Sequence, residues 1–265
     1  MTHFVYVYAK QGTMWDQVVS YVGEEARFTK GGPDELYYSI MSLHKFFQGP
    51  KKIFVVGDKP NIRGVIHIKH DRITKVPHPK AADSFAKLKI ICNHPDINED
   101  FVYMHDDMVV LKPCKEADFR VLRANDLILS PGTYFGPKDR QSSKWKQFFM
   151  LTMTILKKEG LPMWNYETHL PRLFTKSRVM EIINKYDLEK PTQKAQTLFA
   201  SLYYNNYFDE PQQVLSVKTN IKLGVYGPHT ETWFKNNAPG KLFLNYDNSG
   251  LNNHLKKYVK QLLKN

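Results

Sequence analysis

The stretch Phe101-Val-Tyr-Met-His-Asp-Asp-Met-Val-Val110 decides the fold prediction, because an apolar strand there runs directly into two adjacent carboxylates. Its first four residues have the aromatic and β-branched composition of a buried strand. Two carboxylates between apolar runs are costly to bury unless they face a cation or a solvent-filled cleft. A divalent ion on a diphosphate is a suitable partner, since Mg²⁺ and Mn²⁺ favour one or two carboxylates plus phosphate oxygens. The alternative is that Asp106 and Asp107 only begin a turn.

Strands and helices alternate on the N-terminal side of this stretch. The apolar runs predict strands over residues 4–9, 53–56, 65–68 and 101–104, and helical spacing predicts helices over 34–47 and 84–92. This α/β order predicts an open, mostly parallel sheet flanked by helices. Ligands of such sheets bind beyond the carboxyl ends of the strands, which is where the acidic pair falls.

The second half of the chain reads as helices and loops. Residues 144–158 and 178–186 predict amphipathic helices, and residues 251–263 carry an apolar stripe with lysines mostly off it. That last segment is the only candidate for a helix that associates with a membrane surface. No internal repeat or low-complexity linker divides the sequence, so we expect a single domain over 1–265.

Composition excludes several classes of protein. Of the 265 residues, 42% are apolar and 24% are charged, which is typical of a globular chain and not of a disordered or fibrous one. No run approaches the roughly 18 apolar residues of a membrane span. Two cysteines, no disulfide framework and no secretory leader predict a cytoplasmic protein, in the host cytoplasm if a phage encodes it.

The charge is strongly positive and uneven. The formal net charge is +12, and residues 138–158 and 218–265 hold most of the excess. An anionic partner is therefore expected. The alternative is that these lysines only solvate helix faces.

Five short motifs occur in one order between residues 4 and 250. They are Asp34-Glu-Leu-Tyr-Tyr-Ser-Ile40, Val55-Val-Gly-Asp58, His105-Asp-Asp-Met108, Glu167-Thr-His-Leu-Pro171 and Phe243-Leu-Asn-Tyr-Asp247. With them the chain resembles the GT-A nucleotide-sugar glycosyltransferases, and more particularly the Stealth group of capsule sugar-phosphate transferases. His105 stands where that group usually has Asn, and the helix at Asp34 lacks the Arg that commonly follows Leu.

The resemblance implies a GT-A-like domain with a nucleotide-sugar-binding half, 1–115, and an acceptor-side half, 116–265. It implies a Mn²⁺ or Mg²⁺ ion and a nucleoside-diphosphate sugar, expected to be UDP-linked. Asp107 would be the direct metal ligand, Asp106 a second ligand, a ribose contact or a catalytic group, and His229 a third ligand. The other expected donor contacts are Tyr8, Ala9, Asp34, Asp58, Lys87, Asn245 and Asp247.

Some of these positions have simpler readings. Asp58 suits a turn before Lys59-Pro60, and Lys87 suits a solvated helix lysine. Glu167 and His169 lie in a polar and aromatic loop and are the candidates for acceptor binding or general base catalysis. A His or Glu beside Pro171 is equally typical of a helix entry.

The excess lysines are expected to meet the acceptor rather than the donor. A basic enzyme without a membrane anchor resembles a phage DNA-modifying glycosyltransferase, with hydroxymethylcytosine in DNA as the acceptor. The residues expected to contact nucleic acid are Lys138, Arg140, Lys144, Lys146, Lys157 and Lys158. One alternative is a Stealth-like sugar-phosphate transferase, or a glycosyltransferase, that builds a capsular or cell-wall polysaccharide. Another is a nucleic-acid-binding module without catalysis.

Overall fold

The computed structural model describes most of the chain. The described residues are 1–9, 35–73, 75–76, 79–130, 134–135, 144–190, 196–215, 221–247 and 250–264. The sequence motif residue Asp34 lies outside them, as do Lys138 and Arg140. Within the described part, no helix is both long enough and apolar enough to cross a bilayer.

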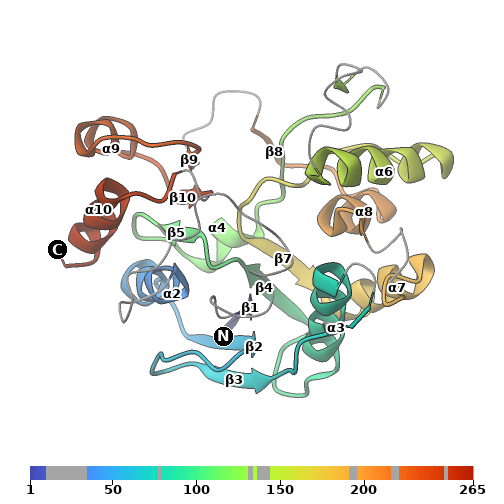
Figure 1. Ribbon diagram of the computed structural model, residues 1–265, viewed down its shortest axis with the longest axis horizontal. Coiled ribbons are helices and arrows are strands. Elements are labelled where there is room, and N and C mark those ends of the chain that lie inside the picture. Colours follow the sequence, from blue (N-terminus) through green and yellow to red (C-terminus); the bar gives the residue numbers. More distant parts are fainter. Residues whose placement is uncertain are drawn as a thin grey trace.

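A five-stranded sheet forms the centre of the fold (Figure 1). Its strands lie in the order β3-β2-β1-β4-β7, and β7 alone runs antiparallel. Their bounds are β1 Thr2–Tyr8, β2 Lys51–Gly57, β3 Ile66–Lys69, β4 Asp100–Met104 and β7 Arg172–Thr175. The predicted open, mostly parallel α/β sheet is therefore confirmed.

Helices cover both faces of this sheet. Their bounds are α2 Glu35–Phe46, α3 Pro79–Asn93, α4 Glu116–Arg120, α6 Lys144–Lys158, α7 Lys176–Tyr186 and α8 Phe199–Asn206. Alternate residues of β1 point to opposite faces, so Val5 packs in the core under α3 while Phe4 and Tyr6 pack in the core under α2. Burial on both faces explains why the strand reads as an uninterrupted apolar run.

The connection from β1 to β2 through α2 adds a strand on one side of β1. The connection from β3 through α3 to β4 adds a strand on the other side. The carboxyl ends of β1 and β4 are therefore the topological switch point, where open α/β sheets bind ligands.

A second, three-stranded sheet continues directly from β4. It has the order β5-β10-β9, with bounds β5 Met108–Val110, β9 Lys222–Val225 and β10 Phe243–Tyr246. The sequence prediction missed this sheet. A two-stranded pair of β6 Arg123–Ala124 and β8 Gln213–Val214 completes the described strands.

The last two helices, α9 Glu231–Asn237 and α10 Asn253–Lys264, pack beside the second sheet (Figure 1). Leu255 and Val259 of α10 are 1% and 3% exposed, and α10 contacts α9 and α2. The apolar stripe that suggested a membrane-associating helix therefore belongs to the protein core.

Candidate functional site

The acidic pair lies in the turn that joins the two sheets. After Met104, the last residue of β4, the chain turns through His105, Asp106 and Asp107 and enters β5 at Met108. The Met108 N–H donates to the His105 carbonyl over 3.3 Å, which closes the turn. The turn thus stands at the switch point of the main sheet, and its three side chains are partly exposed.

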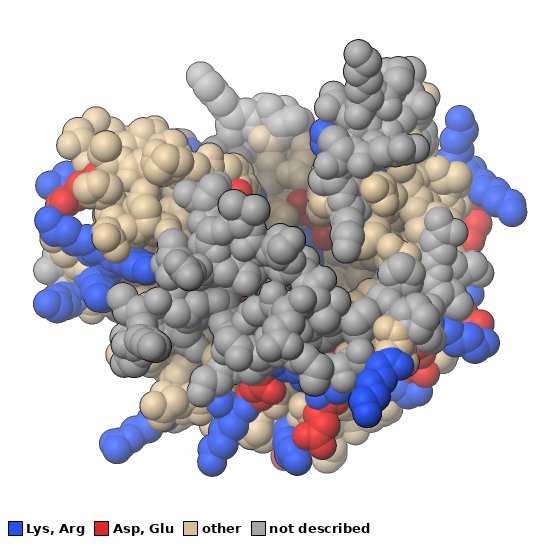
Figure 2. Space-filling model, in the orientation of Figure 1, with Lys and Arg blue, Asp and Glu red and all other residues tan. Residues whose placement is uncertain are grey.

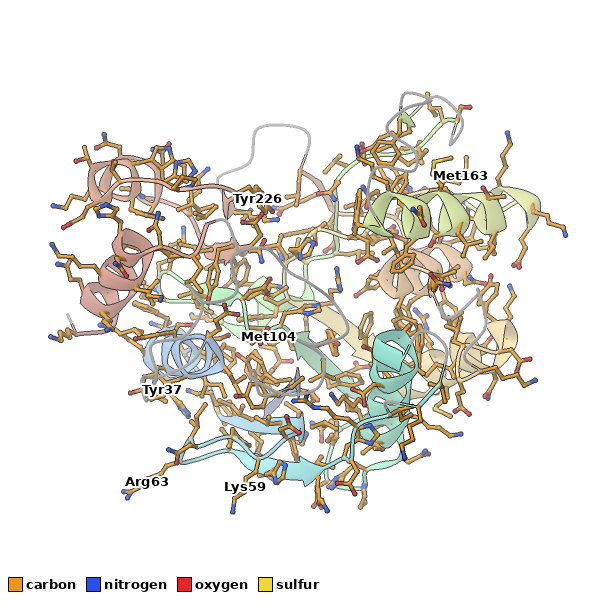
Figure 3. All side chains as sticks on the ribbon, viewed as in Figure 1. Tyr37, Lys59, Arg63, Met104, Met163 and Tyr226 are labelled. Atoms are coloured by element: carbon orange, nitrogen blue, oxygen red, sulfur yellow. The ribbon has the colours of Figure 1, made fainter. Side chains whose placement is uncertain are left out.

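A chain of hydrogen bonds runs from Asp107 across the second sheet. Asn245, which is 1% exposed, donates through Nδ2 to Asp107 Oδ2 over 3.0 Å. The Tyr226 hydroxyl lies 3.2 Å from Asn245 Oδ1, and Lys222 Nζ donates to that hydroxyl over 2.8 Å. Figure 3 labels Met104 near the middle of the molecule and Tyr226 above it. The predicted contact residue Asn245 is therefore joined to the acidic turn.

Lys222 ties this chain to a loop of the other half. Its Nζ also donates to the Thr168 carbonyl over 2.6 Å. Burial lowers the pKa of Lys222 to about 8; Asp107 opposes that shift and Arg172 adds to it. Keeping Lys222 protonated therefore costs free energy at this position, between the acidic turn and the loop that carries Glu167 and His169.

The loop of residues 166–171 ends in Arg172, the first residue of β7. Arg172 Nη2 donates to Glu167 Oε2 over 2.9 Å, and Arg172 Nη1 lies 3.4 Å from His105 Nε2. The other oxygen of Glu167, Oε1, accepts from the Ser201 N–H over 3.2 Å. Both oxygens of Glu167 are therefore engaged, which suits a residue that positions Arg172 better than a general base.

His169 occupies a different position in this loop. Its φ of 49° places it in the left-handed region, which non-glycine residues seldom adopt. The residue keeps exposed surface, but desolvation of the ring within the site lowers its pKa below 6.5. Arg172 and Lys222 lower that pKa further, while Glu167 and Asp247 oppose the shift. The lowered pKa keeps the imidazole neutral at pH 7 and makes it a weaker base than free histidine. Because both oxygens of Glu167 are engaged, His169 is still the better of the two candidates for the general base.

The expected donor contacts of the first half lie at the carboxyl ends of β1 and β2. Lys87 Nζ donates to the Tyr8 carbonyl over 3.3 Å, and it forms a 2.7 Å ion pair with Asp83. Asp58 forms an ion pair with Arg72. Lys87 is 3% exposed, so it is not a solvated helix lysine.

Asp83 is the centre of that buried cluster. It accepts hydrogen bonds from Lys87 and from the Ile73 N–H, and its Oδ1 lies 2.9 Å from His70 Nε2. Burial opposes ionisation of Asp83, but these hydrogen bonds outweigh it and lower its pKa. The cluster joins the carboxyl end of β1 to the first half of α3, and Ala9 directly follows that strand end.

Two further expected residues make contacts elsewhere in the second half, and the Asp247 carboxylate also acts on the pKa of His169 and of Tyr226. The His229 ring stacks on Trp233 with centroids 3.7 Å apart, just before α9. The Asp247 carboxylate accepts from the Gly250 N–H over 2.8 Å. Their roles as metal ligand and donor contact stay predictions.

The donor set of the acidic turn fits a divalent cation that is shared with a substrate. Within the described residues, no group of three or more His, Cys, Asp and Glu side chains is placed to hold a metal. Asp106 and Asp107 are adjacent carboxylates, and the Oδ1 of Asp107 is buried. Magnesium is commonly held by one or two carboxylates together with substrate phosphates, which is the arrangement that this turn can offer.

The cations expected to bind nucleic acid are divided along α6. Lys146 packs over the Phe135 ring at 5.3 Å, whereas Lys157 and Lys158 are exposed at the C-terminal end of the helix. Only the backbone of Lys144 is described. Figure 2 shows the visible Lys and Arg side chains at the flanks and lower edge of this face, including the outer end of α6. Among the described residues, these lysines of α6 do not line one common groove.

Sequence reasoning missed Lys222, Tyr226 and Arg172. Arg172 directly follows the motif that ends at Pro171, so its position next to a candidate loop was a usable signal. Lys222 lies in the basic stretch 218–265, which we assigned to the acceptor as a whole. Its position depends on the pairing of β9 with β10, for which the sequence carries no local signal.

The sequence is similar to two curated capsule enzymes over part of its length, and no family model matches it. It is 32% identical over 107 residues to "Capsular polysaccharide phosphotransferase fcs1" of Haemophilus influenzae, a match that covers 37% of this chain and 29% of that protein. It is 29% identical over 101 residues to "Capsular polysaccharide phosphotransferase" of Neisseria meningitidis serogroup B, covering 35% of this chain and 26% of that protein. The matches thus span less than a third of the length of these relatives.

Two solved structures are also similar. The galactosyltransferase LgtC, in complex with donor and acceptor sugar analogs, matches with a TM-score of 0.44 and 11% identity over 99% of this chain and 95% of that one. The apo form of the glycosyltransferase GlyE of Streptococcus pneumoniae TIGR4 has the same TM-score and identity, over 99% of this chain and 60% of that one.

Proposed function

We propose that this chain is a sugar-phosphate transferase of the capsular polysaccharide type. It would take a nucleoside-diphosphate sugar, expected to be UDP-linked, and transfer the sugar phosphate to a hydroxyl of an acceptor saccharide. The observation that carries the proposal is the hydrogen-bonded connection from Asp107 through Asn245, Tyr226 and Lys222 to the loop of His169. It supports the proposal because it links the acidic turn, which would bind the diphosphate, to the loop of His169, which would accept a proton.

The proposed reaction breaks the phosphoanhydride bond of the donor and forms a phosphoester bond to the acceptor. The acceptor hydroxyl oxygen forms a bond to the phosphorus that carries the sugar, and the bond from that phosphorus to the bridging oxygen breaks. The bridging oxygen leaves on the nucleoside monophosphate. His169, held neutral at pH 7, takes the hydroxyl proton.

The other residues of the site bind and orient. Asp106 and Asp107 would hold a Mg²⁺ or Mn²⁺ ion, which when bound neutralises charge on the diphosphate. Lys222 has three N–H donors and uses two of them on Thr168 and Tyr226. The third can donate to a phosphate oxygen, which the positive charge of Lys222 also attracts.

The similarity to the two capsule phosphotransferases supports this alternative over our first expectation of a DNA acceptor. No comparison supports DNA or a phage origin. The described lysines of α6 also form no continuous groove, since Lys146 packs on Phe135 and the terminal pair lies at the outer end. Glycosyl transfer, with release of the nucleoside diphosphate, remains the second candidate because the same acidic turn can serve it.

The released nucleotide separates these reactions. Purified protein with Mg²⁺ or Mn²⁺, a panel of nucleotide sugars and saccharide acceptors should release nucleoside monophosphate in proportion to acceptor consumed. We expect Asp107→Asn and His169→Ala to lose at least about 100-fold in kcat/KM. Matched controls are Asp71→Asn and His254→Ala, which change exposed residues outside the site.

Release of nucleoside diphosphate instead of monophosphate would show that the chain catalyses glycosyl transfer and not sugar-phosphate transfer. Full turnover by Asp107→Asn would remove the acidic turn from the proposed mechanism.

A further inference from the structure

A cavity of about 170 Å³ lies along the edge strand β7. The end of α4 and the residues after it, the start of α7 and the tyrosines of α8 form its walls. Water in the liquid takes about 30 Å³ per molecule, so this volume accommodates a small group such as a phosphate. The charged residues that line it are four arginines and one carboxylate, namely Arg120, Arg123, Arg172, Arg178 and Asp209.

Three of the four arginines already have a carboxylate partner. The pairs are Arg120 with Glu116 at 2.6 Å, Arg172 with Glu167 at 2.9 Å and Arg178 with Asp209 at 3.2 Å. Within the described part of the chain, Arg123 forms no ion pair. One cation of the cavity wall therefore lacks a counter-ion.

Arg123 is also the most buried of these four arginines, with 6% of its surface exposed. Its Nε donates to Gln213 Oε1 over 2.9 Å, and its Nη1 donates to the carbonyls of Asp118 and Val121 over 3.1 and 3.2 Å. Burial lowers the pKa of Arg123 to about 10, and the more distant Asp118 carboxylate only partly opposes that shift.

The hydrogen-bond partners of Arg123 are thus neutral oxygens, and its Nη2 makes no hydrogen bond to any described residue. A buried charge without a counter-ion is unfavourable, and an anion in the cavity would relieve that cost. A guanidinium suits phosphate oxygens, because its donors form a planar fork.

The cavity adjoins the candidate active site. Arg172 lines it, and the same guanidinium reaches Glu167 and His105. Thr168, which precedes His169, lines it as well. A ligand in the cavity would therefore continue past Arg172 toward the proposed base.

We infer that this cavity is an acceptor subsite that holds a phosphate diester, with Arg123 as its counter-ion. The inference rests on the proposed function. An acceptor that has already received a sugar phosphate carries a diester next to its terminal sugar, so repeated transfer presents this group beside each new acceptor hydroxyl. The subsite would favour a growing chain over an unmodified sugar.

Direct binding tests the subsite without any turnover. The probe is dimethyl phosphate, titrated into the full chain and followed by NMR. Arg123→Gln removes the charge, and Gln213→Glu leaves Arg123 in place but supplies a carboxylate beside its Nε. We expect each change to weaken binding about tenfold or more, while Lys190→Gln, an exposed lysine outside the cavity, leaves it unchanged.

Gln213→Glu keeps the test decisive if Arg123→Gln does not fold, because it adds an ion pair instead of removing one. Equal binding by wild type and Gln213→Glu would overturn the inference, as would absence of binding by the wild type.

Acceptor preference is the second readout. Wild type should use a methyl phosphodiester of the acceptor sugar at least about tenfold better, in kcat/KM, than the neutral methyl glycoside, and Gln213→Glu should lose this preference. Equal use of both acceptors, or a stronger preference for a hexuronic acid, would overturn the phosphate assignment. If no acceptor is used at all, the proposed function fails, and the binding titration still decides the subsite.

Discussion

Replacing Lys222 by methionine removes the ammonium that joins the acidic turn to the loop of His169. The substitution keeps an unbranched side chain of similar length and deletes two hydrogen bonds, to the Thr168 carbonyl at 2.6 Å and to the Tyr226 hydroxyl at 2.8 Å. Lys222→Met therefore tests the role of the ammonium group while it keeps the packing of the aliphatic part of the side chain.

The expected effect on stability is small because two contributions oppose each other. A pKa lowered from 10.5 to about 8 means that keeping Lys222 charged at pH 7 costs about 3 kcal/mol relative to water. Hydrogen bonds from a charged donor contribute about 1.5 kcal/mol each or somewhat more, so the two lost bonds offset that gain. We expect Lys222→Met to change the free energy of unfolding by less than about 2 kcal/mol.

The expected effect on turnover is large. Without the ammonium, the loop of His169 and the hydrogen-bonded chain to Asp107 lose their shared anchor, and misplacement by about 1 Å can cost 100-fold in rate. Urea unfolding measures the first quantity, and nucleotide release under saturating Mg²⁺ measures the second. Wild-type kcat/KM in folded Lys222→Met would refute the assignment.

The pH profile gives an independent reading of the same residue. Because its pKa is lowered to about 8, Lys222 is charged below that pH and loses its proton as the pH rises through it. We expect kcat/KM of the wild type to fall above about pH 8, and Lys222→Arg to extend activity to higher pH, since a guanidinium stays charged. A wild-type profile that is flat from pH 7 to 9.5 would contradict this.

Three further predictions concern the scaffold and the metal. A Cβ at Gly57, whose φ is 125°, would lie 2.1 Å from a backbone oxygen, so Gly57→Ala should lower the free energy of unfolding in urea by about 3 kcal/mol or more. Gly160 has a φ of 69° and open space around a Cβ, so Gly160→Ala should lower it by only about 1–2 kcal/mol. Equal losses of stability in the two variants would show that the backbone around Gly57 shifts and removes the close contact. Lys87→Met should cost about 3–5 kcal/mol, because among the described residues it leaves the buried Asp83 carboxylate with only His70 and the Ile73 N–H as partners. The additional change Asp83→Asn should recover part of that loss, and no recovery would mean that the ion pair is not the cause. Asn245→Leu should raise the Mg²⁺ concentration for half-maximal activity about tenfold, since it removes the hydrogen bond that orients the acidic turn; an unchanged midpoint would argue against metal binding there.

The first half of the fold could be predicted because its signals are local. The apolar runs at 4–9 and 101–104 are buried on both faces, and the helix over 34–47 has Leu36 and Ile40 fully buried as its spacing indicated. Each signal comes from one segment and its solvent exposure, so no knowledge of distant contacts was needed.

The second sheet could not be predicted in the same way. β5, β9 and β10 have three to four residues each, and β5 pairs with a strand more than 130 residues away. Strands this short carry little periodicity, and their pairing is set by packing between distant segments.

The residues of the candidate site also differ in whether a local sequence signal identifies them. Asp106 and Asp107 stood out because two carboxylates interrupt an apolar run, and Asn245 followed from a motif. Lys222 was one of eight lysines in its stretch, and only the alignment of β9 with β10 distinguishes it from the solvated ones. The buried charge of Arg123 was likewise invisible, because burial of a polar side chain depends on what packs over it.

The destination of the donor's phosphorus tests the central claim most directly. Wild-type protein is incubated with Mg²⁺, the nucleoside-diphosphate sugar that it uses and an acceptor saccharide, and the products are followed by ³¹P NMR. We expect one phosphorus of each consumed donor to appear as a phosphodiester of the acceptor and the other as nucleoside monophosphate, with neither signal from Asp107→Asn. Both phosphorus atoms remaining together in a nucleoside diphosphate, with an acceptor product free of phosphorus, would contradict the account.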